Sequence, residues 1–263
     1  MGGGRLSNDR LINNLILALA GFALIAPGAV AARPAKDAHT TPKTHAAHKA
    51  KPKPSKKATK APAEAAKAKA DAAIIPSAAT RRVAEWIAAS ADNGALPYAI
   101  VDKDTASLFL FDAKGKPLAA VPVLIGIAVG DDATPGVGSK KLGEIGPAEK
   151  TTPAGRFLAK FGLAAGRQKV LWVDYHNSVA LHAIPSDASK KERRRERMLS
   201  PTYEDNRITF GCINVPRAFY GKLMRPIFQK KGGYVYVLPD TKPLEAVFPR
   251  LRVEALKDGG LRS

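Results

Sequence analysis

The segment 33–72 contains no aromatic residue and no Leu, Ile or Val, so it has nothing with which to build a hydrophobic core. It holds eleven basic residues against three acidic ones and carries +8 of the formal net charge of +19. Burial of apolar surface is what offsets the conformational entropy that a chain loses on folding. We therefore predict that residues 33–79 form a disordered linker and that the folded part follows it.

The first 32 residues have the order of a secretory signal peptide. A basic start leads into an unbroken apolar run over residues 15–26, and the Ala-Val-Ala of residues 29–31 offers a cleavage site. The alternative is an uncleaved membrane anchor over residues 11–32, although two asparagines shorten its apolar part. Either way, we expect an exported protein of the periplasm or cell envelope.

If the protein is exported, the positively charged linker meets only the polyanions that occur outside the membrane. Outside the membrane the available polyanions are lipid head groups and cell-wall polymers, so we expect an anionic envelope polymer and no nucleic acid. A polyanion-binding role through residues 33–72 stays open as a separate hypothesis. The single cysteine excludes a disulfide framework and a Cys-based zinc site.

Beyond the linker, short apolar runs alternate with turn signals, which predicts a mainly β domain of the sandwich or barrel-like kind with one or two helices. We expect a short helix over residues 80–96, capped by Thr80, then a domain over residues 97–239 and a C-terminal extension over 240–263. Strands are expected at 98–102, 108–111, 117–129, 155–163, 169–174, 179–184 and 234–238, and helices at 189–199 and 216–230.

Cys212 is the strongest candidate nucleophile. It follows Gly211, which permits a sharp turn, and it precedes the helix expected from Pro216, which Asn214 can cap. A thiolate near a helix N-terminus is stabilised by the helix dipole, so we expect a lowered pKa for Cys212. The competing interpretation is a small buried hydrophobic residue.

A cysteine nucleophile needs a base, and the folded part offers His176 and His182. His176 belongs to a run that predicts a hairpin turn facing solvent. His182 ends an apolar strand, where a side chain can reach a neighbouring loop. Spacing alone leaves the choice between the two open.

At these residues the sequence resembles the L,D-transpeptidase family, in its YkuD-type catalytic domain. The block that starts at His182 (His-Ala-Ile-Pro) is similar to the family's first block, and residues 209–214 (Thr-Phe-Gly-Cys-Ile-Asn) are similar to its second. Residues 151–157 (Thr-Thr-Pro-Ala-Gly-Arg-Phe) are similar to the family's Thr-Pro-x-Gly-x-Phe. The resemblance covers residues 97–239.

The sequence departs from the family pattern in two places. Phe210 stands where the family usually has a histidine, and phenylalanine neither exchanges a proton nor donates a hydrogen bond. In addition, 26 residues separate His182 from Thr209, a longer interval than in the family, and the extra length contains a basic run within residues 186–207. We interpret this insertion as a solvated, salt-bridged helix, the alternative being a lid or a contact for an anionic wall polymer.

The resemblance implies acyl transfer on peptidoglycan tetrapeptide stems without metal or cofactor. It implies that His182 takes the proton of Cys212, that the carbonyl of Ala183 orients the histidine, and that amides near Gly211 hold the oxyanion. Thr209 and Asn214 are the expected substrate contacts. The alternative function is a weak or inactive cell-wall-binding module of the same fold.

Overall fold

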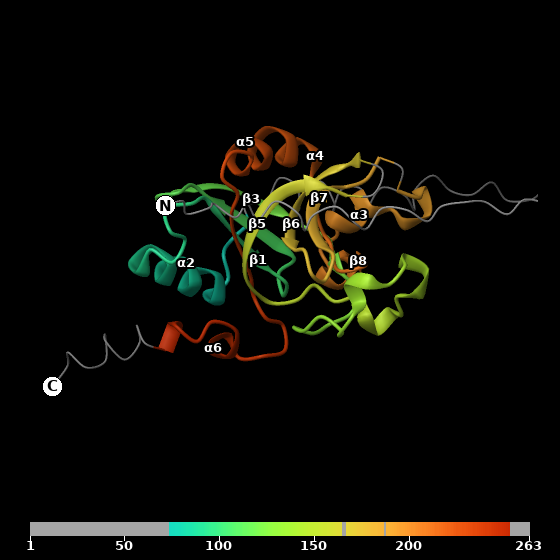
Figure 1. Ribbon diagram of the computed structural model, residues 1–263, viewed down its shortest axis with the longest axis horizontal. Coiled ribbons are helices and arrows are strands. Elements are labelled where there is room, and N and C mark those ends of the chain that lie inside the picture. Colours follow the sequence, from blue (N-terminus) through green and yellow to red (C-terminus); the bar gives the residue numbers. More distant parts are fainter. Residues whose placement is uncertain (1–73, 165–166, 187, 253–263) are drawn as a thin grey trace, which may run out of the picture. The chain divides into compact units, whose positions relative to one another are not determined.

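A computed structural model of the chain describes residues 74–164, 167–186 and 188–252 (Figure 1). The predicted signal segment, residues 1–32, and the predicted linker up to residue 73 lie outside the described residues. The described chain begins with an irregular stretch at Ile74 and enters helix α2, Ala78–Ser90, so the last two residues assigned to the linker are helical.

Short strands dominate the described residues, and the predicted mainly β class is confirmed. Eight strands form one sheet in the order β3-β2-β1-β10-β5-β6-β7-β9, and β4 pairs with β8. The strands are β1 Tyr98–Asp102, β2 Ser107–Phe111, β3 Pro117–Pro122, β4 Ile125–Gly126, β5 Gly155–Leu163, β6 Lys169–Asp174, β7 Val179–Ala183, β8 Arg207–Thr209, β9 Ile213–Val215 and β10 Gly233–Val237.

The two ends of this sheet are tied together, which gives the fold its barrel-like form. Leu124, just after the edge strand β3, forms an antiparallel bridge with Asn214 in the opposite edge strand β9. Each residue's amide donates to the other's carbonyl at 2.9 Å. The predicted stretch 117–129 is therefore divided: β3 ends at Pro122 and the chain turns away to pair with β9 and β8.

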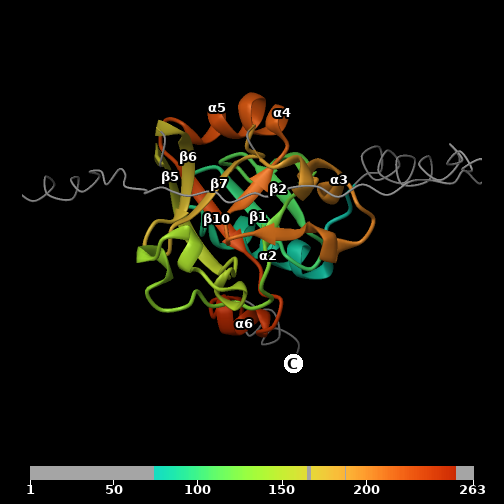
Figure 2. The same ribbon diagram turned by 90° about the vertical axis from the view of Figure 1, so that its right-hand side faces the viewer.

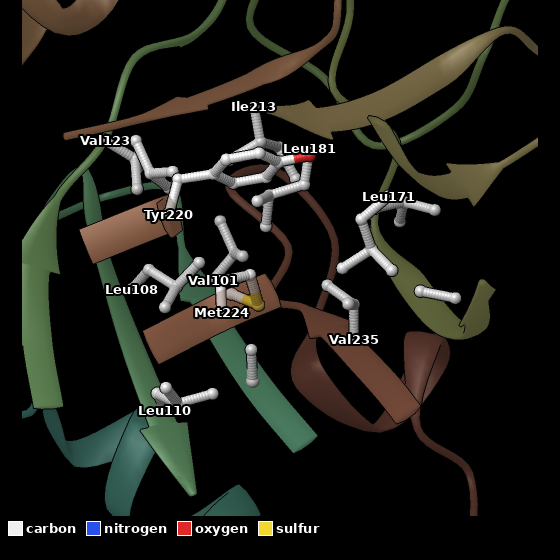
Figure 3. Packing of buried hydrophobic residues seen from close by; sticks show 14 of the residues in the cluster. Val101, Leu108, Leu110, Val123, Leu171, Leu181, Ile213, Tyr220, Met224 and Val235 are labelled. Carbon is white, nitrogen blue, oxygen red and sulfur yellow. The ribbon is translucent and has the colours of Figure 1, made fainter. Parts of the chain in front are cut away.

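One face of the sheet is covered by a continuous helical segment made of α4 Arg217–Phe219, a π-helical turn Tyr220–Met224 and α5 Arg225–Phe228. Figure 3 shows Tyr220 and Met224 pointing into the apolar layer that the strands present, with Leu108, Leu181 and Val235 among their neighbours. Each such side chain, once fully buried, contributes about 2 kcal/mol to folding.

The other face of β1 and β10 carries a second apolar cluster beneath α2 and α6, Leu244–Val247. Both views place α4 and α5 on one side of the sheet and α6 on the other (Figures 1 and 2). The residues expected to form a C-terminal extension contribute Phe248 and Leu251 to this cluster, so the described part of that segment belongs to the folded unit.

Helix α2 begins and ends differently from the prediction. Its N-cap is Ser77, whose hydroxyl accepts from the Thr80 amide at 3.0 Å. Thr80 lies inside the helix instead, and its hydroxyl donates to Asp102 at 2.9 Å. The helix stops at Ser90 because Ala91 adopts the left-handed conformation, several residues before the expected end.

A fully buried lysine fixes the long loop between β4 and β5. Lys103 Nζ donates to the carbonyls of Gly130 and Thr152, at 2.7 and 3.1 Å, and to the carboxylates of Asp131 and Asp240, at 2.7 and 3.2 Å. The loop and the segment after β10 are thereby held to the β1–β2 turn. Thr152, whose carbonyl Lys103 binds, donates a hydrogen bond from its hydroxyl to the carbonyl of Gly211, the residue before Cys212.

Candidate active site

Strands β7 and β9 carry the candidate residues, because they are parallel neighbours with His182 opposite Asn214. Successive side chains of a strand point to opposite faces of the sheet. Leu181 and Ile213, both fully buried, enter the core, and His182 and Asn214 lie on the other face. Cys212 precedes Asn214 by two residues, so it shares that face and lies diagonally across from His182.

The turn before β9 is built around Gly211. Its φ of 118° is one that L side chains rarely adopt, and an added Cβ would lie 2.6 Å from the Thr151 carbonyl oxygen. The Gly211 carbonyl accepts from Thr152 Oγ1 at 2.8 Å, and the same hydroxyl accepts from the Gly126 amide at 2.9 Å. The turn that presents Cys212 is thus anchored to the block resembling Thr-Pro-x-Gly-x-Phe.

Thr209 closes this turn from the other side. Its hydroxyl donates to the Cys212 carbonyl at 2.6 Å and accepts from the Gly211 amide at 3.2 Å. Thr209 is buried, so its polar atoms serve the turn and are not presented to a substrate as expected. The Gly211 amide, expected to hold an oxyanion, is engaged in the same turn and would have to leave Thr209 to do so.

The Cys212 thiol is half-buried and in hydrogen-bond contact with the Ser178 carbonyl, with an Sγ to oxygen distance of 3.7 Å. Burial raises the pKa of Cys212, whereas the Ala180 amide and the cation of Arg194 lower it, and the net direction is upward. At neutral pH the resting group is therefore the thiol. The prediction of a lowered pKa is wrong.

The reason for that difference is the position of the next helix. Strand β9 separates Cys212 from the helix, which begins only at Arg217 with Pro216 as its N-cap and no side-chain cap. The helix dipole acts within about one turn of its end, so it does not favour this thiolate. Asn214, expected to cap the helix, is fully buried inside β9 instead.

His182 is held in one tautomer by its own strand. Nδ1 lies 2.9 Å from the Ala183 carbonyl oxygen, which only accepts, so Nδ1 carries the proton and the lone pair is on Nε2. Burial lowers the pKa of His182, the bond to Ala183 acts in the opposite direction, and the cation of Arg194 lowers it further. The result at neutral pH is a neutral imidazole whose Nε2 lone pair lies 3.3 Å from Asn214 Nδ2.

The other candidate base lies elsewhere. His176 occupies the turn between β6 and β7 and is exposed. Of the two histidines in the folded part, His182 is the one that shares a sheet face with Cys212. Strand pairing therefore favours His182 as the candidate base, a choice that spacing alone leaves open.

The basic insertion reaches the site through Arg194, the first residue of α3, Arg194–Met198. Its side chain is only 13% exposed, and it donates from Nη1 to Asn214 Oδ1 at 2.6 Å and from Nε to Glu192 Oε2 at 2.7 Å. Met198, at the end of α3, is buried. The interpretation of the insertion as a solvated, salt-bridged helix is therefore wrong about the exposure of Arg194 and Met198, although Arg194 does form an ion pair with Glu192.

Phe210 lies at the rim of the site with 38% of its surface exposed. The Lys150 ammonium sits over its ring, 3.8 Å from the centroid. Such a contact between a cation and an aromatic face is attractive by about 0.5–1 kcal/mol when exposed. A hydrogen-bond donor is thus present beside Phe210, although the ring itself supplies none.

Several residues that shape the site were not identified from the sequence. Thr152 and Lys150 lie in or beside a matched block, and that block was the signal available for them. Arg194 belongs to a run of like charges, and nothing in the run distinguishes it from its neighbours. Lys103 follows a strand in a turn, where a lysine is ordinarily exposed.

The described residues show neither a membrane-spanning helix nor a cluster of metal-binding side chains. No helix in this part of the chain is long and apolar enough to cross a membrane. Nor do the described residues contain a group of three or more His, Cys, Asp or Glu side chains that could hold a metal ion.

Comparison with known proteins gives similarity to solved structures only. No family's sequence profile matches the chain, and no curated protein matches it. An L,D-transpeptidase domain from Xylanimonas cellulosilytica DSM 15894 is similar with a TM-score of 0.31 and 14% identity over 54% of this chain and 60% of that one. Bd1075 from Bdellovibrio bacteriovorus is similar with a TM-score of 0.35 and 16% identity over 64% and 58%.

The helical cell shape determining protein Pgp2 from Campylobacter jejuni is similar with a TM-score of 0.38 and 13% identity over 70% of this chain and 64% of that one. The chain thus spans less than two thirds of the length of these structures.

Proposed function

We propose that this protein acts on the bacterial cell wall as a cysteine-dependent L,D-transpeptidase, with peptidoglycan stem peptides as acyl donors. The observation that carries the proposal is the pair formed by Cys212 and His182. His182 lies in β7 and Cys212 directly precedes the neighbouring strand β9, and the Ala183 carbonyl fixes the histidine with its lone pair on Nε2. A thiol beside an oriented neutral imidazole is the arrangement that nucleophilic acyl transfer requires.

In the proposed reaction, Nε2 of His182 takes the thiol proton as Cys212 Sγ attacks the carbonyl carbon of the donor peptide bond. The tetrahedral intermediate collapses, the bond to the leaving D-alanine breaks, and His182 returns the proton to the departing amine. A thioester on Cys212 remains. An acceptor amine then attacks it, giving up a proton to His182, and the new amide leaves as the thiol is restored.

Because the resting thiol is neutral, proton transfer belongs to the reaction step and does not precede binding. A substrate that displaces the contact between Cys212 and the Ser178 carbonyl frees the thiol to turn towards His182, whose Nε2 must release its hydrogen bond from Asn214 before it accepts the proton. Oxyanion stabilisation is assigned to backbone amides of the turn at residues 209–212, with the Gly211 amide available once it releases Thr209. No metal or cofactor has a step in this scheme.

Export through residues 1–32 and tethering by the linker over residues 33–73 are part of the same proposal. They rest on the sequence pattern alone. A basic linker next to a catalytic domain would hold that domain near an anionic envelope polymer.

A second candidate function is favoured by Phe210. If the histidine usual at this position is needed for turnover, the domain binds stem peptides without transferring them. Lys150, stacked on the ring, then serves binding only. This candidate predicts retention on purified sacculi by the wild type and by Cys212→Ala equally, with no change in the muropeptides.

Incubation of the full chain with tetrapeptide-rich peptidoglycan, followed by muropeptide analysis, tests the proposal. New cross-linked dimers should appear with the wild type, disappear with Cys212→Ala and be strongly reduced with His182→Gln. His176→Gln is the matched control, since it removes the other histidine of the folded part from an exposed turn and should leave the products unchanged. Wild-type protein that yields neither dimers nor trimmed stems, but is retained on sacculi, would establish the binding candidate instead.

A further inference from the structure

The side chain of Asn214 stands between an arginine and the histidine. On one side Arg194 Nη1 donates to Asn214 Oδ1 at 2.6 Å, and on the other side Asn214 Nδ2 lies 3.3 Å from His182 Nε2. Arg194 is held in turn by Glu192, at 2.7 Å from its Nε. A hydrogen-bonded row therefore runs from the insertion to the ring of His182.

Arg194 determines which atoms donate and which accept along this row of hydrogen bonds. A guanidinium group only donates, so the atom of Asn214 that faces Arg194 must be the amide oxygen. The amide nitrogen then faces His182 and donates to Nε2, which must hold a lone pair. The Ala183 carbonyl imposes the same tautomer from the other side of the ring.

From this geometry we infer that Arg194 is a positioning residue, supplied by the insertion, that sets the Asn214 amide and thereby keeps His182 neutral with its basic lone pair on Nε2. The inference rests on the proposed function, to which it adds the residue that prepares the base. Arg194 acts through Asn214 and is not itself a catalytic residue.

Electrostatics supports the same assignment. The charged group that acts on His182 is Arg194, which is paired in turn with Glu192. The cation of Arg194 lowers the pKa of His182 and also lowers that of Cys212. It therefore keeps the imidazole unprotonated, so that the ring can accept a proton, and it stabilises the thiolate that the transfer from Cys212 creates.

Without Arg194 the Asn214 amide is free to rotate. If its oxygen turns to His182, both ring nitrogens meet an acceptor, because Nδ1 already faces the Ala183 carbonyl. Two acceptors favour the doubly protonated ring, and the repelling cation is gone. The predicted consequence of Arg194→Leu is a His182 that charges at higher pH and is a poorer base at neutral pH.

The test is nitrogen-detected NMR of the histidine rings in the full chain, which distinguishes the two neutral tautomers and the imidazolium. The His182 signal is identified by its loss in His182→Gln. The wild type should show the Nδ1-protonated tautomer, and Arg194→Leu should move the titration midpoint to higher pH. Arg194→Lys keeps a donor-only cation and should restore wild-type behaviour in part.

Arg195→Leu is the matched control, since Arg195 is the exposed neighbour in the same helix and the change in charge is identical. It should leave tautomer and midpoint as in the wild type. Asn214→Asp provides a second route if Arg194→Leu does not fold, because a carboxylate beside Nε2 should also raise the midpoint. The inference is overturned if Arg194→Leu gives a folded protein whose tautomer and midpoint match those of Arg195→Leu.

These NMR outcomes do not depend on turnover, so they separate this inference from the proposed function. If the wild type makes cross-links, Arg194→Leu should lower kcat about tenfold with little change in KM, the size expected for losing a hydrogen bond to a charged group. If the wild type makes none while the NMR shift is seen, the positioning role stands and the transpeptidase proposal fails.

Discussion

Replacing Lys103 with methionine should be among the most destabilising single changes in the folded part. The Lys103 side chain is 0% exposed, and its ammonium group is shared by two carboxylates that are themselves 1% and 2% exposed, those of Asp131 and Asp240. Lys103→Met keeps the apolar stem and removes only the charge and its four hydrogen bonds. The change therefore isolates the buried charge from side-chain packing.

The expected loss in the free energy of unfolding depends on the partners that Asp131 and Asp240 keep once Lys103 is replaced. Breaking a buried ion pair by removing one partner costs about 3–5 kcal/mol, because a buried charge is left uncompensated. Here Asp240 keeps Arg207, at 2.5 Å, and Asp131 keeps the amides of Thr241 and Lys242. These remaining partners place the expectation near the lower limit, at about 3 kcal/mol. For a folded part of this size that is a fall in Tm of roughly 10 °C.

Thermal and urea unfolding followed by circular dichroism measure this cost, with Lys242→Met as the matched control. Lys242 also pairs with an aspartate, Asp132, but the two side chains are 42% and 75% exposed, and such surface pairs contribute less than about 1 kcal/mol. Equal unfolding free energies for Lys103→Met and Lys242→Met would refute the argument that the buried network holds the loop.

The same network sets a pH dependence. Burial alone raises the pKa of Asp131, but hydrogen bonds from Lys103, Thr241 and backbone amides outweigh it and hold the pKa well below the usual range. A carboxylate with a lowered folded-state pKa stabilises the fold above its unfolded pKa of about 3.9, and that contribution is lost as the pH falls below it. The free energy of unfolding of the wild type should therefore fall as the pH is lowered from about 5. In Asp131→Asn this dependence on pH should be weaker.

Three further predictions concern the turn that presents the nucleophile. Gly211→Ala should lower the free energy of unfolding in a urea titration by about 2 kcal/mol, because φ is positive and the added Cβ would lie 2.6 Å from the Thr151 oxygen. Gly221→Ala is the control, since an added Cβ there meets nothing within 4 Å, and it should be neutral or stabilising. Thr152→Val should cost about 1–2 kcal/mol by leaving the Gly211 carbonyl without its donor, and Thr152→Ser should recover most of it. Alkylation of Cys212 by iodoacetamide should rise with pH around a midpoint above the ordinary cysteine range, since burial raises its pKa, and a midpoint below that range would contradict the buried-thiol description.

The sequence predicted the strands well, because their signal is local. The strands β1, β5 and β6 have the predicted bounds, since each is a run of β-favouring residues closed by a turn. The short strands β8 and β9 were not predicted, because three residues are too few for a period-two pattern. Their pairing with distant strands is what defines them.

The sequence identified those residues of the site that have reactive side chains or belong to a recognisable motif. Cys212 and His182 were singled out, but the direction of the pKa shift of Cys212 was predicted wrongly, because the pKa of a thiol depends on burial and on where the helix starts, and neither is local. Arg194 was missed for the same reason. A basic run predicts exposure, and only the folded path of the insertion brings one of its members against Asn214.

Asn214 explains why fold and site are hard to separate in this protein. Its backbone amide and carbonyl both bond to Leu124, which closes the barrel-like sheet, and its side chain links Arg194 to His182. A shift in the sheet closure therefore moves the group that orients the base. Preorganisation of this kind requires the supporting residues to lie on rigid elements, and Asn214, fully buried in a strand, meets that requirement. An insertion can thus supply Arg194 without loosening the site, since the insertion meets the site at Asn214, a fully buried residue of the strand pair that closes the sheet.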